Sequence, residues 1–173
     1  IFSNRHIAPY DYCKKSQSSP TKNIKFMIRQ ANPDDAAEIA AIYNKYVTET
    51  TISFETEPVS VSEMRDRIVA ISSGFPYLVC ERGGHIAGYS YAHLWKERAA
   101  YAHTFETTIY VASECQCQGI GTELMRALIA ACQKQGARAL IACITDGNKP
   151  SVAMHAMLGF KQVSQFEKVG IKF

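Results

Sequence analysis

Residues Ile109–Thr122 read IYVASECQCQGIGT. A β-type run, Ile109-Tyr110-Val111, leads through a polar turn to Gly119 and Gly121, and a helical pattern follows at once. Backbone N–H groups at the start of a helix point outward, and the helix dipole favours negative charge there. A glycine has no side chain, so a diphosphate can approach its backbone closely. The stretch therefore predicts a strand–turn–helix unit that binds a phosphorylated ligand.

The glycine turn differs from two common nucleotide-binding motifs. No Gly-Lys-Ser/Thr follows it, which excludes the P-loop. The first of the three glycines of the dinucleotide fingerprint is absent, and no strand–turn–helix unit opens the chain. We expect a ligand that is neither a simple nucleotide nor NAD.

Composition places the chain among ordinary globular proteins. Its 173 residues are 47% hydrophobic and 20% charged, which is typical of one domain with a sizeable core. The net charge of +3 is too small, and too scattered, to indicate nucleic-acid binding. No apolar run approaches membrane-spanning length, and the start of the sequence lacks the apolar segment of a signal peptide.

The cysteines show neither metal-ligand nor secretory spacing. They are Cys13, Cys80, Cys115, Cys117, Cys132 and Cys143. We expect all of them to be reduced, in a cytoplasmic protein without a bound metal.

The elements alternate from Met27 onward, whereas residues 1–26 are polar and turn-rich and show no sustained periodicity. We therefore expect 1–26 to be an N-terminal extension outside the fold and 27–173 to be the domain. Apolar spacing, helix caps and turn residues predict a strand that opens at 27–29, and further strands at 77–80, 86–94, 104–111, 139–144 and 160–165. They also predict helices after Asn32, Ser60 and Gly119 and at 151–158. The order β-α-α-β-β-β-α-β-α-β predicts an α/β (α+β) fold, with a mixed sheet and helices on both of its faces.

This order, with the glycine turn after the fourth strand, resembles the GNAT superfamily of acyl-CoA N-acetyltransferases. Gln116, Gly119 and Gly121 match its signature of Gln or Arg, two residues, Gly, one residue, then Gly or Ala. Asn148, Ser151 and His155, followed by Leu158-Gly159-Phe160, resemble its second cofactor segment. The resemblance implies the GNAT fold, with a mostly antiparallel sheet, and acetyl-CoA as co-substrate.

Two further segments resemble the phosphinothricin acetyltransferase branch of that superfamily. They are Ile52–Pro58 and Arg98–Glu106, the latter followed by Tyr110-Val111. The branch implies a homodimer that acetylates the α-amino group of phosphinothricin, methionine sulfoximine or methionine sulfone. Cys115 and Cys117 stand where the branch usually has His and Arg, which removes one positive charge. Relatives also continue through a further aromatic strand, which is missing after Phe173.

Acetyl transfer to an amine needs a base for the amine proton and an acid for the leaving thiolate. Glu106, in an apolar and Thr-rich run, could take the proton directly or through water; the alternative is a strand Glu that faces solvent or pairs with a Lys. Resemblance favours the catalytic role. His155 occupies the place where relatives often have a Tyr that protonates the thiolate, and the alternative is a His that only packs. A covalent route through Cys115 or Cys117 has no base at a suggestive spacing.

The resemblance assigns the binding residues as well. The cofactor-binding residues are Ile109, Tyr110, Val111, Gln116, Cys117, Gln118, Gly119, Ile120, Gly121, Thr122, Asn148 and Ser151. Of these, Asn148 is also a turn residue that could cap the last helix. Phe54, Lys96, Arg98 and Tyr101 would contact the acceptor; the alternative for the last three is a solvated loop.

Two other functions stay open. One is acetylation of proteins, peptides or polyamines, and the other is a non-catalytic acetyl-CoA-binding module. Positive charge in the acceptor segments disfavours the first, and the retained Glu106 disfavours the second.

Overall fold

The structure of the chain is a computed structural model that describes residues 1–4 and 26–173. Its strands are β1 (Phe2–Asn4), β2 (Met27–Gln30), β3 (Tyr77–Arg82), β4 (His85–Leu94), β5 (Thr104–Val111), β6 (Ala139–Ala142) and β7 (Lys161–Gln162). Its α-helices are α1 (Ala36–Glu49), α2 (Val61–Ser72), α3 (Ile120–Lys134) and α4 (Lys149–Met157). Short 3-10 turns lie at η1 (Pro33–Asp35), η2 (Ala99–Tyr101) and η3 (Ser113–Cys115).

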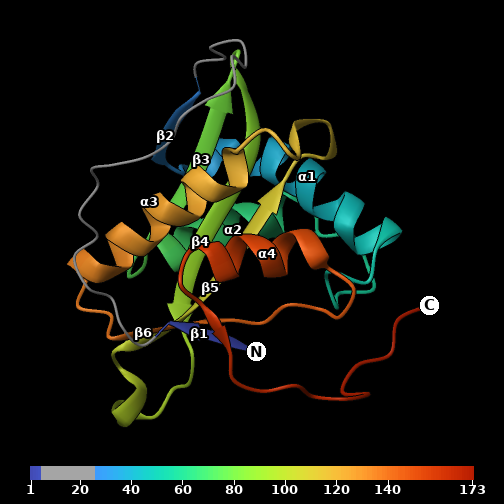
Figure 1. The fold of residues 1–173 in the computed structure, drawn as a ribbon. Helices are drawn as coiled ribbons and strands as arrows, with labels where there is room; N and C mark the ends of the chain where they lie inside the picture. The colour runs from blue at the N-terminus through green and yellow to red at the C-terminus, as the bar shows by residue number, and fades with distance from the viewer. Residues whose placement is uncertain (5–25) are drawn as a thin grey trace, which may run out of the picture.

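The strands form one twisted sheet in the order β2-β3-β4-β5-β6-β1-β7 (Figure 1). Among the described strands β5 and β6 run parallel, and every other neighbouring pair is antiparallel. The predicted mixed, mostly antiparallel sheet is confirmed.

Helices cover both faces of the sheet and enclose two cores. On one face, Leu124 and Leu128 of α3 pack with Phe105 of β5 and Phe160. On the other face, helices α1 and α2 pack against β3 and β4, with Ile39 and Ile68 fully buried. The sheet between the cores is the platform on which a site can be built.

The predicted caps set the helix starts. Asn32 accepts from the backbone N–H of Asp34 at 2.9 Å, and the Asp35 carboxylate accepts from the N–H of Asn32 at 2.8 Å. Ser60 accepts from the N–H of Glu63 at 3.1 Å, as a helix N-cap does. Asn32 thus caps η1, which runs directly into α1, and Ser60 caps α2 itself, as the sequence indicates.

The start of the chain departs from our expectation that residues 1–26 lie outside the fold. Phe2–Asn4 form β1, which inserts between β6 and β7 and pairs antiparallel with both. Phe2 is 7% exposed and joins the α3-side core. The burial of Phe2 and the pairing of both strand edges account for the difference. Residues 5–25 of the predicted extension lie outside the described part.

Candidate active site

Strands β5 and β6 separate where the site lies. They pair only from Thr104↔Ala139 to Glu106↔Ile141, although β5 continues to Val111. Beyond Glu106, the edge of β5 that faces β6 has no strand partner among the described residues. Extended backbone with a free edge can pair with an elongated ligand as a further strand would. The predicted cofactor strand, Ile109–Val111, lies on this open edge.

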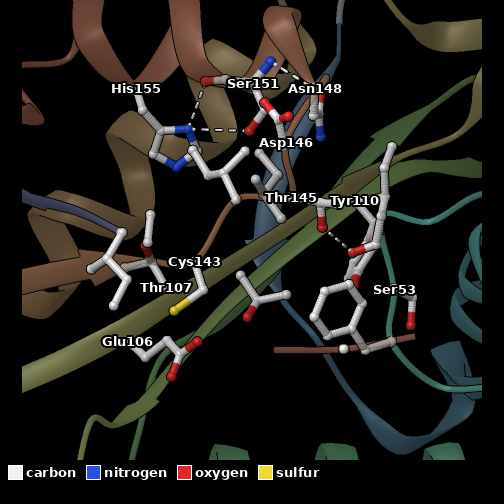
Figure 2. Close-up of a pocket in the computed structure, with 18 of the residues that line it drawn as sticks. Ser53, Glu106, Thr107, Tyr110, Cys143, Thr145, Asp146, Asn148, Ser151 and His155 are labelled. Atoms are coloured by element: carbon white, nitrogen blue, oxygen red, sulfur yellow. Dashed lines mark hydrogen bonds between the residues drawn. The ribbon is translucent and has the colours of Figure 1, made fainter. Parts of the chain in front are cut away.

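A pocket of about 800 Å³ lies at this separation (Figure 2). Residues of β5, of α4 and of the loop between α1 and α2 line it. Its lining includes the predicted residues Phe54, Glu106, Ile109, Tyr110, Asn148, Ser151 and His155. The structure therefore brings together both predicted catalytic residues and members of three predicted binding segments. Sequence reasoning missed Ile1, Tyr43, Trp95 and Cys143, and also the tail residues Phe166 and Lys168–Gly170.

Glu106 lies at the point where the strands part, with its carboxylate toward the pocket (Figure 2). Its side chain is 23% exposed, and its Oε2 is 3.9 Å from Nε2 of His93 on β4. The Cys143 thiol lies close enough to the carboxylate to interact with it. Desolvation by neighbouring groups, together with this carboxylate, raises the pKa of Cys143 to about 11, so the thiol stays protonated. The arrangement is a partly buried carboxylate beside an imidazole and a thiol.

Two other carboxylates line the same pocket, and both are held by other groups. Glu55 forms a two-pronged ion pair with Arg67, at 2.7 and 3.3 Å. The Asp146 carboxylate accepts from the N–H of Gly147 at 2.9 Å and is exposed. Glu106 is therefore the carboxylate best placed to exchange a proton in the pocket.

The glycine turn has the backbone geometry of an anion cradle. Gly119 is the N-cap of α3 and has a φ of 82°, a conformation that favours glycine. A Cβ at Gly121 would meet Sδ of Met154 at 3.4 Å and Cγ2 of Val111 at 3.6 Å, so the helix start lies close against β5 and α4. Cys117 also lies in the left-handed region, with a φ of 57°. A helix start of this kind can bind a diphosphate.

The glutamines of the turn fix its position. Gln116 donates through Nε2 to the Tyr46 hydroxyl at 3.0 Å, and that hydroxyl donates to the carbonyl of Val111. Gln118 donates through Nε2 to the carbonyl of Glu114 at 2.9 Å. Gln116 therefore ties the turn to α1 and to the open edge of β5.

The start of α4 lines the other side of the pocket. Asn148 accepts from the N–H of Ser151 at 3.3 Å, which confirms its capping role. The Ser151 hydroxyl lies 3.3 Å from Nδ1 of His155, one turn further along the helix (Figure 2). Asn148 and Ser151 thus line the same pocket as the β5 edge.

His155 is 2% exposed, and its protonation state follows from its contacts. Nδ1 lies 2.8 Å from the carbonyl of Ser151, which can only accept, so Nδ1 carries the proton. Nε2 is buried and has no hydrogen-bond partner among the described residues. Burial lowers the pKa of His155 below 6.5, against the smaller opposing effect of the Ser151 carbonyl. The imidazole is therefore neutral near pH 7, which weakens the prediction that it donates a proton.

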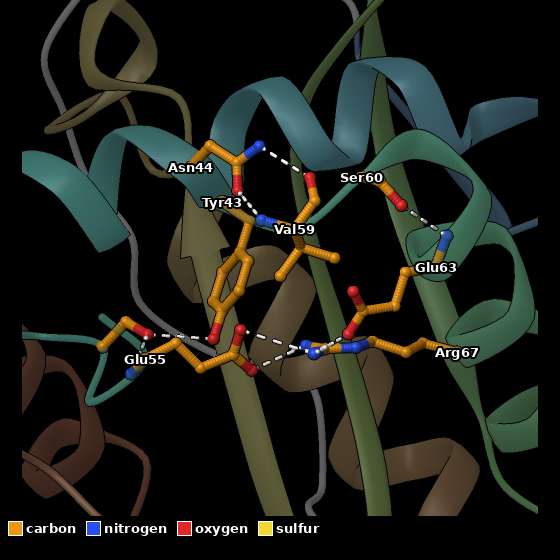
Figure 3. A network of polar contacts seen from close by, with 8 residues as sticks. Tyr43, Asn44, Glu55, Val59, Ser60, Glu63 and Arg67 are labelled. Atoms are coloured by element: carbon orange, nitrogen blue, oxygen red, sulfur yellow. Dashed lines mark hydrogen bonds and ion pairs between the residues drawn. The ribbon is translucent and has the colours of Figure 1, made fainter. Parts of the chain in front are cut away.

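The loop between α1 and α2 forms a wall of the pocket, and a polar network fixes it (Figure 3). The Asn44 side chain makes two hydrogen bonds to the backbone of Val59, at 2.9 and 2.8 Å. The Tyr43 hydroxyl lies 2.9 Å from the Ser53 hydroxyl, and Arg67 holds Glu55. With both ends of the loop anchored, Phe54 projects at 58% exposure beside the pocket.

The other predicted acceptor residues are not part of the pocket lining. Lys96, Arg98 and Tyr101 lie in or beside η2, between β4 and β5, and none of them lines the pocket. Nζ of Lys96 stacks over the Trp95 ring, 5.0 Å from its centroid, and Trp95 itself lines the pocket. The solvated-loop alternative therefore describes these three residues better. The aromatic residue beside them was the overlooked signal.

Three further predictions can be compared with the described residues. No group of three or more His, Cys, Asp or Glu side chains there is arranged to hold a metal ion. Cys80, Cys115, Cys117, Cys132 and Cys143 are free thiols, and Cys13 lies outside the described part. None of the helices described is long and apolar enough to cross a membrane.

Comparison with known proteins places this geometry in a family. Residues 39–160 match the family described as Acetyltransferase (GNAT) family. The phosphinothricin N-acetyltransferase of Alcaligenes faecalis is 41% identical over 148 residues, which cover 84% of this chain and 75% of that protein. The L-methionine sulfoximine/L-methionine sulfone acetyltransferase of Pseudomonas paraeruginosa is 33% identical over 148 residues, which cover 84% of this chain and 86% of that protein.

A solved structure extends the comparison to three dimensions. It is a GNAT superfamily phosphinothricin acetyltransferase from Sinorhizobium meliloti in complex with AcCoA. Its TM-score with this chain is 0.82 at 33% identity, over 85% of this chain and 80% of that one. The glycine turn, the parted strands and these likenesses agree: the chain belongs to the acetyltransferase (GNAT) family.

Proposed function

We propose that the chain transfers the acetyl group of acetyl-CoA to the α-amino group of a small amino acid of the phosphinothricin or methionine sulfone type. One observation carries the proposal: Glu106 lies at the split between β5 and β6, beside an open strand edge that leads to the glycine turn. The names of the relatives at 41% and 33% identity support the choice of acceptor.

Acetyl-CoA supplies the activated acetyl thioester. In the proposal, the backbone of Ile109–Val111 pairs with its extended arm, and Asn148 and Ser151 hydrogen-bond the arm from the opposite side. The N–H groups of residues 119–122 at the start of α3 bind its diphosphate. Gln116, Cys117 and Gln118 shape this turn. These contacts position the thioester beside Glu106 and convert a bimolecular reaction into one between held groups.

Glu106 is the proposed general base. At neutral pH the α-amino group of an amino acid is a protonated ammonium. It must lose a proton before its nitrogen can attack the thioester. The Glu106 carboxylate accepts this proton, directly or through a water, while the Cys143 thiol and His93 orient it. His155 stays a predicted acid for the leaving sulfur, although its neutral state near pH 7 disfavours that role.

The acceptor's own carboxylate needs a cation. The basic residues that line the pocket among those described are Lys168 and His155, and His155 is neutral. We therefore propose Lys168 of the tail, with Phe54 and Trp95 as apolar walls, in place of the predicted Lys96 and Arg98.

The first prediction concerns Glu106→Gln, which keeps the shape of the side chain and removes its basicity. Turnover should fall by about 10²–10⁴-fold, the usual contribution of a general base. The affinity for acetyl-CoA should stay unchanged, because Glu106 lies off the glycine turn. A thiol-release assay from pH 6 to 10 with methionine sulfone, phosphinothricin, spermidine and a peptide, together with calorimetric titration of acetyl-CoA, measures both effects.

The same assay decides among the functions. Activity on the two amino acids alone supports the proposal, whereas activity on spermidine or the peptide alone identifies the second enzyme function. Binding of acetyl-CoA without thiol release from any amine identifies a binding module. A Glu106→Gln enzyme with the wild-type pH–rate profile would remove Glu106 as the base.

The oligomeric state and the cellular compartment are also proposed. We propose that the protein is a homodimer, as the branch implies, and works in the cytoplasm, where its free thiols remain reduced. Light scattering at several protein concentrations tests the dimer.

A further inference from the structure

The glycine turn has no cation of its own. Residues 112–122 contain Glu114 and neither Lys nor Arg. Lys45 of α1 is the nearby ammonium, and it pairs with Glu114 at 3.8 Å. Backbone N–H groups donate hydrogen bonds to a diphosphate but do not neutralise its negative charge. Hydrogen bonds from a cationic side chain bind it more strongly than those from neutral donors. The cation must therefore come from another element.

Arg82 is the cation that the fold brings to the turn. It is the last residue of β3, and its Nη1 donates a hydrogen bond to Oε1 of Gln118. Gln118 lies between Cys117 and Gly119, the residues that set the left-handed backbone of the cradle. The other end of the Gln118 amide is fixed on the carbonyl of Glu114. The guanidinium is therefore held against the glycine turn through Gln118, although Arg82 is more than thirty residues away in sequence.

Arg82 forms no ion pair in the described part of the chain. Arg29 and Arg67 each pair with two carboxylates. Arg82 has no carboxylate within ion-pair distance among the described residues. A guanidinium has five N–H donors in a planar fork, so one can bind Gln118 while others bind an anion.

We propose that Arg82, held by Gln118, binds the diphosphate of coenzyme A and supplies the positive charge that the glycine turn lacks. The inference rests on acetyl-CoA as co-substrate and is independent of the amine. It assigns a role to a residue of the β3–β4 hairpin, which no cofactor motif of the sequence includes.

Calorimetric titration of coenzyme A into the purified protein tests the proposal without any catalytic turnover. Arg82→Gln should raise the Kd about tenfold, because a charge-assisted contact is replaced by a neutral one. Arg82→Lys should restore part of the affinity, since the charge returns without the planar fork. Arg138→Gln is the matched control: Arg138 is exposed and lies beyond the opposite end of α3, so its Kd should stay within twofold.

Dephospho-CoA, which keeps the diphosphate and lacks the ribose 3′-phosphate, identifies the group that is bound. The loss in Arg82→Gln should be as large for dephospho-CoA as for coenzyme A. A loss confined to coenzyme A would overturn the assignment to the diphosphate. The salt dependence gives a second measure, and the Kd of Arg82→Gln should rise less steeply with ionic strength than that of the wild type.

A gain of affinity completes the test. Cys117→Arg introduces a guanidinium into the turn itself and should rescue Arg82→Gln, while adding little to the wild type. Equal Kd values for the wild type and Arg82→Gln would overturn the inference and leave the proposed function intact. Absence of coenzyme A binding by the wild type would instead remove the proposed function. Should Arg82→Gln fail to fold, Gln118→Ala, which releases the Arg82 side chain, should show the same loss.

Discussion

At the scale of single residues, His155 illustrates how a fold selects one protonation state. Its ring packs at 84° against Phe160, with 5.0 Å between the centroids. Its Nδ1–H donates to the carbonyl of Ser151, one turn earlier in the same helix. An imidazolium at this position would lose its hydration and gain no counter-ion among the described neighbours, which lowers the pKa. Protonation of His155 therefore works against folding.

The sign of this effect gives a second prediction. Because the folded pKa is below the unfolded value of about 6.5, the unfolded chain binds the extra proton as the pH falls. The His155 contribution to stability is complete above pH 6.5 and is lost as the pH falls through the folded pKa. The loss is at most about 1.4 kcal/mol per pH unit. Urea unfolding at pH 7.5 and 5.5 should show a smaller difference for His155→Gln than for the wild type.

His85→Gln is the control for that experiment, because the His85 side chain is 84% exposed and lacks the burial that explains the effect at His155. Its Nδ1 lies 3.6 Å from the Glu38 carboxylate. It should keep the acid sensitivity that His155→Gln loses. If both variants lose it equally, the effect is not caused by burial of His155.

At the scale of elements, β4 and β5 approach each other closely near the end of β5, along the segment proposed to bind the cofactor. Gly88 of β4 pairs with Val111, and a Cβ there would lie 2.9 Å from the carbonyl oxygen of Tyr110 and 3.2 Å from Cα of Val111. These are backbone atoms, so relief requires a shift of β5 itself. Gly88 thus sets the position of the strand edge that the acetyl-CoA arm would follow.

A third prediction follows for Gly88→Ala. The free energy of unfolding should fall by about 1–3 kcal/mol, as for an overpacked core. The Kd for coenzyme A should rise too, because Tyr110 and Val111 must move. Gly74→Ala is the control, since no heavy atom lies within 4 Å of its added Cβ and its φ is not in the left-handed region. Its stability should change by no more than about 0.5 kcal/mol. Equal effects in urea unfolding would contradict the steric argument.

Local signals explain what could be predicted at this scale. The Asn32 and Ser60 caps, the Gly83–Gly84 hairpin and the strand at 104–111 depend on neighbouring residues, and the structure has them as predicted. The glycine turn and Glu106 could be singled out because their chemistry is unusual for their surroundings. The approach of Cys143 to Glu106 and of Arg82 to Gln118 depends on strand register, which has no local signature.

At the scale of the whole molecule, β1 is the element that sequence reasoning missed. Three residues have no periodicity to detect, and their burial depends on strands from the far end of the chain. The strand also reaches the site, because Ile1 lines the pocket together with Cys143 and Glu106. The domain boundary drawn at residue 27 therefore divides a single sheet.

A fourth prediction tests this boundary. Phe2→Ala should lower the free energy of unfolding by about 3 kcal/mol, because it removes a ring that is buried in the core. Phe173→Ala, at a ring that is 84% exposed, should leave it unchanged. Urea unfolding measures both variants. A Phe2→Ala protein as stable as the wild type would show that β1 contributes nothing to the core.

The place of β1 between β6 and β7 also fixes an order of events during synthesis. Phe2–Asn4 leave the ribosome before any other strand described, yet their partners β6 and β7 are among the last segments to be translated. Pairings between distant parts of a chain form slowly. Until β1 docks, the edges of β6 and β7 remain open, and such edges promote misassembly. We expect the pocket wall around Ile1 and Cys143 to be the last part of the protein to assemble.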